Sequence, residues 1–478
     1  MRRILWLAAL ACLTSVTPAL AQPDPSIVFV ANNGNLEGSV SALRVNPDGT
    51  LTLIDRLVTG SRPSMNDPCP GCNAYEISLS PDGRTLVTGH AASNDPMEQL
   101  TFLAVADDGT LEELAAFSIL GTPMDVVWID DAYLAVTRTE TSPDQVVVYR
   151  FDPSGPTLTE VEAADTGSFT TYLALHPALP VLYAQNSGTG RSVSAFAIAP
   201  DRTLSLIDTE STGSYYALEL TLSHDGTKLY SAGGITEVVL GYQVAPDGSL
   251  TPMAGSPFPE SGDSPSNVFC SSDDRYLLVG HGTDATLRSA AIDPVTGGLT
   301  YTGFLFDVGL QGTLGDVAAV DSLVFVTDNS TAVDGIMGIY SFRLNPNGSF
   351  TPNGGIVSTG GITPRSIAVR RSDASDVAEG PGAPARLRAA VCPNPLLGAG
   401  WIRYELPQAG AVTIEIADAA GRVVRHLRRP PQPAGWHRAA WDGADDAGAV
   451  LPAGVYLARV RAAERQATCK VLLLAPQR

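Results

Sequence analysis

Apolar and polar residues alternate with a period of two along most of the chain, which predicts short β-strands rather than amphipathic helices. The pattern recurs about every 46–50 residues, a spacing typical of propeller blades. Each repeat carries a tight turn between two strands, of a type that needs residues tolerant of positive φ. Seven such turns occur, at Asp48-Gly49, Asp108-Gly109, Ser154-Gly155, Asp201-Arg202, Asp247-Gly248, Gly297-Gly298 and Asn347-Gly348.

The two ends of the repeat region are out of phase with the repeat. Residues 27–30 fit a second strand of a unit, and residues 365–369 fit a lone inner strand. Pairing these ends would complete one unit from both termini and close a ring. We therefore predict a seven-bladed β-propeller over residues 22–371. A β-solenoid is the alternative, but it gives no reason for complementary ends.

A second domain is expected at the C-terminus. Residues 372–384 are rich in Ala, Gly, Pro and Ser and suit a flexible linker. Short alternating segments then return at 401–406, 411–417, 423–427, 435–441 and 454–460. This pattern predicts an Ig-like β-sandwich over residues 385–478, so the whole protein is expected to be all-β.

The first 21 residues have the features of a signal peptide. Arg2 and Arg3 precede the apolar residues 4–16, and Ala19-Leu20-Ala21 forms a cleavage site. We expect export to the periplasm, the cell surface or the medium. No later apolar run is long enough to span a bilayer, so no membrane span is expected.

The charge is divided unevenly along the chain. The formal net charge is −20, with −26 on residues 1–380 and +6 on residues 381–478. An acidic propeller repels nucleic acid, which excludes it as a partner. A small molecule, a glycan or a surface protein all stay open as partners, as does the oligomeric state.

Five cysteines follow the signal peptide. Cys69 and Cys72 lie in a Pro-rich loop, where their spacing favours a local disulfide. Cys392 and Cys469 open and close the C-terminal domain, which suggests a second disulfide. Cys270 lies in an apolar strand and is expected to be buried.

One polar position per blade precedes the first apolar residue of the inner strand. These positions are Glu76, Asp125, Tyr172, Glu219, Asn267, Asp316 and Ser366. The following strand returns antiparallel and ends in a second row at Asn32, His90, Arg138, Asn186, Gly233, His281 and Asp328. We expect both rows to surround one channel mouth and to pair Glu76 with His90, Asp125 with Arg138, and Asn267 with His281.

These rows supply the chemistry for several kinds of site. Glu76 with His90 can take a proton from water, and Arg138 or Arg365 can hold a carboxylate or an oxyanion. We predict Glu76, His90 and Arg138 as catalytic candidates. The candidate ligand-binding residues are Asp125, Tyr172, Glu219, Asn267, His281, Asp316 and Arg365. No cofactor is required, although Ca²⁺ is a candidate ligand of Glu76, Asp125, Glu219 and Asp316. A rim of merely solvated polar residues is the third option.

The repeat region resembles the seven-bladed lactonase-type propellers, the family of 6-phosphogluconolactonase and its cycloisomerase relatives. The resemblance rests on the seven turns and on strand–turn–strand segments such as 77–87 and 220–230. It implies a propeller fold and a lactone-opening activity. Active relatives often carry Pro-His where an inner strand starts, whereas the corresponding pairs here are Ala74-Tyr75, Pro123-Met124, Pro265-Ser266 and Pro364-Arg365.

The C-terminal segment resembles the FlgD-type Ig-like domain and the related type IX secretion sorting domain. Six blocks match in order: 394–395, 402–407, the Asp418 to Val424 turn, 434–437, 441–443 and 451–456. This resemblance implies a role in export, attachment or assembly. The sequence thus favours an exported or cell-surface propeller that binds a ligand or cation at one channel mouth. The alternative is a secreted lactonase-like hydrolase that opens a non-phosphorylated lactone with Glu76 and His90.

Overall fold

The computed structural model describes most of the chain between residues 26 and 474. The described residues are 26–64, 66–91, 98–260, 262–308, 314–329, 336–371, 388–392, 396–397, 400–406, 410–418, 421–432, 435–462 and 465–474. The predicted signal peptide and the predicted linker therefore lie outside them. The chain divides into two compact units, Pro25–Arg371 and a second unit that includes Ser372–Arg478.

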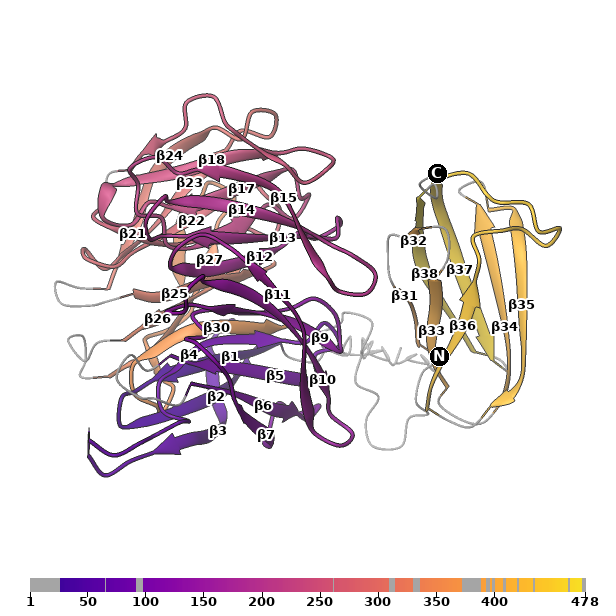
Figure 1. Ribbon diagram of the computed structural model, residues 1–478, viewed down its shortest axis with the longest axis horizontal. Coiled ribbons are helices and arrows are strands. Elements are labelled where there is room, and N and C mark those ends of the chain that lie inside the picture. Colours follow the sequence, from indigo (N-terminus) through magenta and orange to yellow (C-terminus); the bar gives the residue numbers. More distant parts are fainter. Residues whose placement is uncertain are drawn as a thin grey trace, which may run out of the picture. The chain divides into compact units, whose positions relative to one another are not determined.

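The described strands of the first unit form seven antiparallel sheets (Figure 1). One sheet contains β3 (Leu51–Ser61), β2 (Glu37–Val45), β1 (Ile27–Asn33) and β30 (Pro364–Arg370). The next three sheets contain β4 (Ala74–Leu79), β5 (Thr85–His90), β6 (Gln99–Val105) and β7 (Leu111–Ser118); β8 (Val126–Trp128), β9 (Tyr133–Arg138), β10 (Gln145–Asp152) and β11 (Thr157–Asp165); and β12 (Thr170–Leu175), β13 (Val181–Asn186), β14 (Ser192–Ile198) and β15 (Leu204–Ser211).

The remaining three sheets follow the same order from the inner to the outer strand. They contain β16 (Leu220–Leu222), β17 (Lys228–Ala232), β18 (Val238–Val244), β19 (Leu250–Pro252) and β20 (Phe258–Pro259); β21 (Pro265–Cys270), β22 (Tyr276–His281), β23 (Thr286–Ile292) and β24 (Leu299–Asp307); and β25 (Leu314–Val320), β26 (Leu323–Asp328), β27 (Gly338–Leu344), β28 (Phe350–Pro352) and β29 (Val357–Ser358). A single 3₁₀ turn, Gly234–Thr236, is the only helical element among the described residues, and no helix there is long or apolar enough to cross a bilayer.

The inner strands of the seven sheets form a closed ring. Each contacts the next in the order β30, β4, β8, β12, β16, β21 and β25, and β25 contacts β30 again. The sheets are thus the blades of a seven-bladed propeller around a central channel. The predicted fold class is confirmed.

The first and last strands of the propeller pair with each other. Ile27 of β1 lies opposite Arg370 of β30, and Val30 lies opposite Ile367. Figure 1 shows β1 in indigo beside β30 in orange, although the two are far apart in the sequence. The complementary ends close the ring, as the phase of the repeat predicts.

Apolar side chains fill the interfaces between neighbouring blades. At one interface Phe102 of β6 stacks on Phe151 of β10 with 3.9 Å between ring centroids, and Trp128 packs edge-on against both. At another, Phe29 is fully buried beside Ala42 and Ile77. These interfaces fix the direction of the inner strands and hence of the side chains at their starts.

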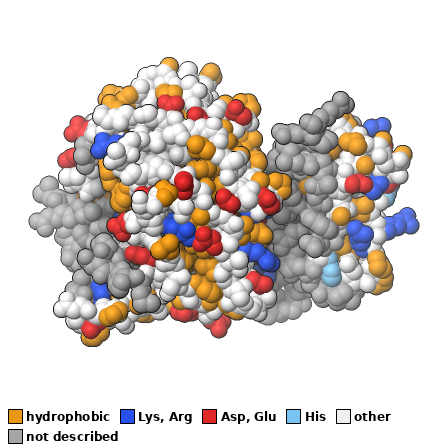
Figure 2. All heavy atoms as spheres, in the orientation of Figure 1, with side chains coloured by type: hydrophobic (Ala, Val, Ile, Leu, Met, Phe, Trp, Pro, Cys, Tyr) orange, Lys and Arg blue, Asp and Glu red, His pale blue; other side chains and the backbone are white. Residues whose placement is uncertain are grey.

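The second unit is a β-sandwich. One sheet contains β31 (Arg388–Cys392), β33 (Gly400–Leu406) and β36 (Gly435–Trp441), and the other contains β32 (Leu396–Leu397), β38 (Arg465–Leu474), β37 (Gly454–Ala462), β34 (Gly410–Asp418) and β35 (Val423–Gln432). Trp441 and Tyr456 are buried between the sheets and contact each other edge to face. In Figure 2 red Asp and Glu side chains are spread over the visible propeller face, and blue Lys and Arg side chains stand out on the sandwich.

Candidate functional site at the channel mouth

Side chains from three inner strands meet inside the channel. Tyr172 from β12 donates a hydrogen bond of 3.3 Å to Oε1 of Glu76 on β4. Another inner strand, β8, lies between them in the ring, so this contact reaches across part of the channel. Arg365 on β30 approaches the same carboxylate, with 3.6 Å between its Nε and Glu76 Oε1.

The ring of Tyr75, a residue outside the two predicted rows of polar positions, holds Arg365 in place. Its guanidinium lies 3.7 Å from the centre of the Tyr75 ring and donates a 2.5 Å hydrogen bond to the Tyr75 hydroxyl. The side chain of Arg365 is 23% exposed and that of Glu76 is 9% exposed, so Arg365 is the more accessible of the two. In the sequence, Tyr75 stands out only by its place beside Glu76, in the pair Ala74-Tyr75 at the start of an inner strand.

Two buried polar atoms of the channel have no hydrogen-bond partner among the described residues. They are Nε of Arg365 and Oδ1 of Asn267. The amide nitrogen of Asn267 does have partners, since it donates to Glu219 Oε2 at 2.8 Å and to the carbonyl of Gly315 at 3.2 Å. Arg365 Nε still faces the Glu76 carboxylate at 3.6 Å, whereas Asn267 Oδ1 has no such neighbour. Since an unpaired buried polar atom is costly, Asn267 Oδ1 is the clearer candidate for contact with a bound molecule.

Burial dominates the electrostatics of the channel carboxyls. It raises the pKa of Glu76, against the opposing effect of the Arg365 charge, and raises that of Glu219 well above the ordinary value. Burial and the Glu76 charge raise the pKa of Asp125 well above its usual range and that of Asp316 to about 8. The carboxyls also raise one another's pKa because they share one channel.

Asp125 and Asp316 join neighbouring blades. The carboxylate of Asp125 accepts hydrogen bonds from the backbone N–H of Val126 and, in the next blade, of Leu173, at 2.7 and 2.6 Å. Asp316 does the same with Val317 and Ile367. The hydroxyl of Ser366 likewise accepts a bond from the N–H of Ile77 in the adjacent blade. These three positions therefore have a structural role in holding the ring together.

The predicted calcium site does not fit the arrangement of the carboxylates. Both oxygens of Asp125 and of Asp316 accept backbone hydrogen bonds, and Glu219 is bonded to Asn267. Within the described ranges no three His, Cys, Asp or Glu residues lie close enough to hold one metal ion. Since Ca²⁺ needs six to eight oxygen ligands, no calcium chemistry is derived for these residues.

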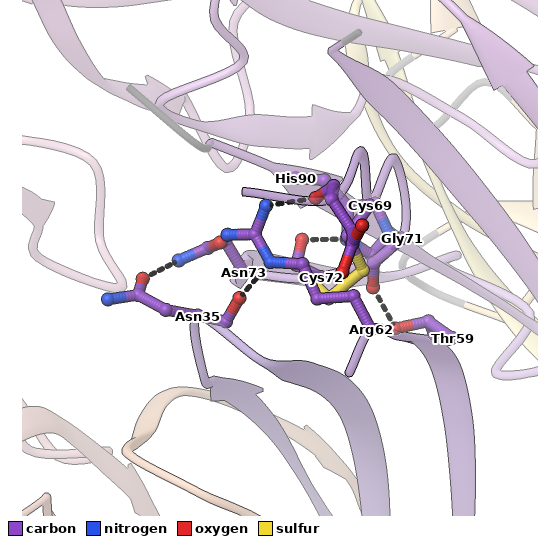
Figure 3. Close-up of a disulfide and its surroundings, with 9 residues drawn as sticks. Asn35, Thr59, Arg62, Cys69, Gly71, Cys72, Asn73 and His90 are labelled. Atoms are coloured by element: carbon purple, nitrogen blue, oxygen red, sulfur yellow. Dashed lines mark hydrogen bonds between the residues drawn. A yellow bond between two sulfur atoms is a disulfide. The ribbon is translucent and has the colours of Figure 1, made fainter. Parts of the chain in front are cut away.

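His90 is not placed beside Glu76. Its Nδ1 bonds to the carbonyl of Cys72 at 2.9 Å, and both residues are labelled in Figure 3. Its Nε2 bonds to the hydroxyl of Thr101 at 2.9 Å, and the side chain is buried. Burial lowers the pKa of His90 to about 4. A neutral ring with both nitrogens engaged is a structural element and is not available as the predicted base.

The other two predicted pairs also do not form. Arg138 bonds to Gln145, Tyr149 and Glu160, so its guanidinium points along its own blade toward the outer strand β11. His281 is buried in its blade, where Nδ1 bonds to the carbonyl of Thr286 and Nε2 faces Oε1 of Glu260 at 3.6 Å. Neither residue lines the channel cluster.

A one-residue offset in register explains why the two pairs with histidine fail. Glu76 lies opposite Gly89, so His90 is the next residue along the strand. Asn267 lies opposite Gly280 in the same way, and His281 is the next residue there. Because successive residues of a strand point to opposite faces, the two side chains of each of these pairs point apart.

The cysteines agree with the predictions in part. Cys69 and Cys72 form a disulfide, and the Thr59 hydroxyl bonds to the Gly71 carbonyl between them (Figure 3). Cys270 is a buried free thiol. Cys469 is also free, which overturns the predicted pairing with Cys392: its Sγ faces the carbonyl of Ala458 on the neighbouring strand at 3.8 Å and packs against the sandwich core.

Comparison with known families supports both resemblances. Residues 132–254 match the family described as lactonase, 7-bladed beta-propeller. Residues 399–466 match the FlgD Ig-like domain family. No match was found among curated proteins.

Several solved structures share the propeller fold. The periplasmic gluconolactonase PpgL of Pseudomonas aeruginosa is 18% identical, with a TM-score of 0.56 over 73% of this chain and 99% of its own. A putative 6-phosphogluconolactonase of Bacteroides uniformis is 16% identical, with a TM-score of 0.55 over 73% of this chain and all of its own. A Lactobacillus plantarum protein is 15% identical, with a TM-score of 0.58 over the same share of this chain and 99% of its own. At these identities the likeness concerns the fold.

Proposed function

We propose that this is an exported or cell-surface protein whose propeller binds a small polar ligand at the channel mouth. Glu76, Tyr172, Arg365 and Tyr75 would contact the ligand, and the Ig-like unit would serve export, attachment or assembly. One observation carries the proposal. Polar groups from different blades converge there, Arg365 is partly exposed, and Asn267 Oδ1 has no hydrogen-bond partner among the described residues.

The charges of the channel favour an uncharged ligand rich in hydroxyl groups. Four carboxyls share the channel with the single guanidinium of Arg365, which already has Glu76 and Tyr75 as neighbours. Among the described channel residues named above, only Arg365 could balance the charge of a phosphate group, and Glu76 already pairs with it. Sugar hydroxyls, in contrast, can both donate to carboxylate oxygens and accept from the guanidinium.

Substitution of Glu76 tests this binding. We expect E76Q to weaken binding of D-glucose or glucono-δ-lactone by about tenfold or more, because a charge-assisted hydrogen bond is worth roughly 1.5–3 kcal/mol. Isothermal titration calorimetry measures the change. The exposed Glu113 on β7 provides the matched control, E113Q, which should bind as the wild type does. Absence of binding to the wild type, or equal binding by E76Q, would refute the proposal.

A lactone-opening hydrolase is the second candidate function. The raised pKa of Glu76 brings this carboxyl closer to the neutral range, where proton transfer is most effective. Glu76 would take a proton from water as the oxygen attacks the lactone carbonyl, and would return it to the ring oxygen when that C–O bond breaks. Release of acid from a non-phosphorylated lactone, followed at constant pH, should then be lost in E76Q. Equal rates in wild type and E76Q would refute catalysis and leave binding intact.

Export is tested by the N-terminus of the mature protein. If residues 1–21 are a signal peptide, the protein recovered outside the cytoplasm should begin at Gln22. N-terminal sequencing of the fractionated protein measures this directly. Recovery of the full-length chain from the cytoplasm alone would contradict the expectation.

A further inference from the structure

A polar pocket of about 500 Å³ is lined by none of the channel residues named so far. It is formed by the loop after β13 and the loop after β15, and is lined by Ser187, Gly188, Thr189, Gly190, Arg191, Ser211, Gly213 and Tyr216. This volume lies within the range of small-ligand sites. Because Asn186 at the end of β13 lies opposite Thr170 at the start of β12, the pocket opens on the face where the inner strands begin.

Arg191 is the charged residue of this pocket. Its guanidinium lies 5.5 Å from the centre of the Tyr216 ring and donates a hydrogen bond to the carbonyl of Ser214. No carboxylate among the described residues forms an ion pair with it, although the chain carries 50 Asp and Glu against 30 Lys and Arg. The ring and the carbonyl hold the side chain in one position, and the other N–H groups of its fork stay available.

Hydroxyl groups complete the lining around Arg191. Thr189 and Tyr216 both border the pocket. Among the described residues, neither hydroxyl group has a hydrogen-bond partner. The loop after β13 is held in place at Ser187, because its buried hydroxyl bonds to the hydroxyl of Thr171 and to the carbonyl of Ala217. A fixed cation with adjacent hydroxyl donors is suited to an oxyanion.

We propose that this pocket binds a small hydroxylated carboxylate, with the carboxylate on Arg191 and the hydroxyl groups toward Thr189 and Tyr216. A guanidinium offers two parallel N–H groups to the two oxygens of a carboxylate, which fixes the ligand's orientation. Phosphate is the weaker candidate, because its second negative charge enters the field of a strongly acidic protein.

The pocket does not require the channel ligand of the proposed function. Its residues come from the loops after β13 and β15, whereas Glu76 and Arg365 lie on β4 and β30. The two regions are nevertheless near each other, since the Tyr216 hydroxyl contributes to the raised pKa of Tyr75 in the channel. A molecule with a carboxylate at one end and hydroxyl groups at the other would fit the pocket alone.

The test is calorimetric titration of the full mature chain with D-galacturonate, with D-galactose as its uncharged counterpart. We expect galacturonate to bind the wild type, and R191Q to bind it at least about tenfold more weakly. Tyr216→Phe keeps the ring under Arg191 and should lose only a few-fold. Arg150, exposed on β10, provides the matched control R150Q, which makes the same change in charge and should leave binding unchanged.

Each other outcome overturns the proposal in a different way. If R191Q binds galacturonate as tightly as the wild type, or if the wild type does not bind it, the pocket is not a binding site for this ligand. Binding of inorganic phosphate as tight as that of galacturonate shows that the ligand class is wrong. If E76Q weakens galacturonate binding and R191Q does not, the sugar hydroxyl groups bind at Glu76 in the channel, and the result supports the proposed function alone. Unchanged melting temperatures show that the variants are folded.

Discussion

Raising the pH from about 6.5 to about 8.5 is expected to lower the melting temperature of the propeller. The cause is the set of buried channel carboxyls, whose pKa values are raised by burial and by one another. Asp316 has a pKa of about 8 in the folded protein, whereas an aspartate in an unfolded chain titrates near ~4. Between these values the folded state holds a proton that the unfolded chain has lost.

The sign of the effect follows from this difference. The bound proton stabilises the folded state fully at pH values below the pKa of the carboxyl in the unfolded chain. This stabilisation is lost as the pH rises through the pKa of the same carboxyl in the folded protein. Its size is on the order of a few kcal/mol, since each pKa unit corresponds to ~1.4 kcal/mol. Below pH 6.5 the buried His90 acts in the opposite direction, because its pKa is lowered to about 4 and it must stay neutral. Because several carboxyls act against this one histidine, we expect stability to be greatest at mildly acidic pH.

Calorimetry or circular dichroism at a series of pH values measures this profile. Asp316→Asn serves as the diagnostic variant, because it removes the titrating group while keeping the shape of the side chain. It should lower the melting temperature throughout, as one backbone acceptor is lost, and it should flatten the decline between pH 6.5 and 8.5. A decline of the same steepness in Asp316→Asn would assign the effect to other groups.

Phe29→Ala is expected to destabilise the propeller by about 3–5 kcal/mol, the usual cost of deleting a fully buried aromatic ring. Phe29 lies on β1 opposite Ala368 of β30 and is fully buried in the apolar cluster next to the closing blade. The cavity would therefore form in the blade that closes the ring. Urea denaturation, followed by the fluorescence of Trp128 and by circular dichroism, measures the loss.

Leu206→Ala is the matched control for this deletion. Leu206 lies on β15 and is 59% exposed, so its loss should cost less than about 0.5 kcal/mol. If Phe29→Ala costs no more than Leu206→Ala, the paired termini do not contribute to stability as described.

The architecture could be predicted because it follows from local signals that recur. The turn at Asp48-Gly49 and its six counterparts mark the hairpins, and Gly49 has the positive φ of 85° that such a turn requires. Ile27 and Arg370 could be assigned to one blade because the repeat begins and ends out of phase. Such features can be predicted from the periodicity of the sequence and from the conformational preferences of single residues.

The channel mouth could be predicted only in part. The first row of polar positions contains Glu76 and Tyr172, which the structure brings together, and Arg365 was among the candidate ligand-binding residues. The second row failed because its histidines lie one residue beyond the positions opposite Glu76 and Asn267, and the sequence does not mark this offset. The roles of Asp125 and Asp316 depend on hydrogen bonds to the neighbouring blade, which become visible only once the blades are packed.

The pairing of β1 with β30 also has a consequence for the order of folding. The ladder that closes the ring joins residues near 27 to residues near 370, so it cannot form until almost the entire propeller has been synthesised. Until then β1 presents an edge without its partner strand, and such an edge favours association with other chains. The most vulnerable stage in the life of this protein is therefore the interval between synthesis of its first strand and of its last.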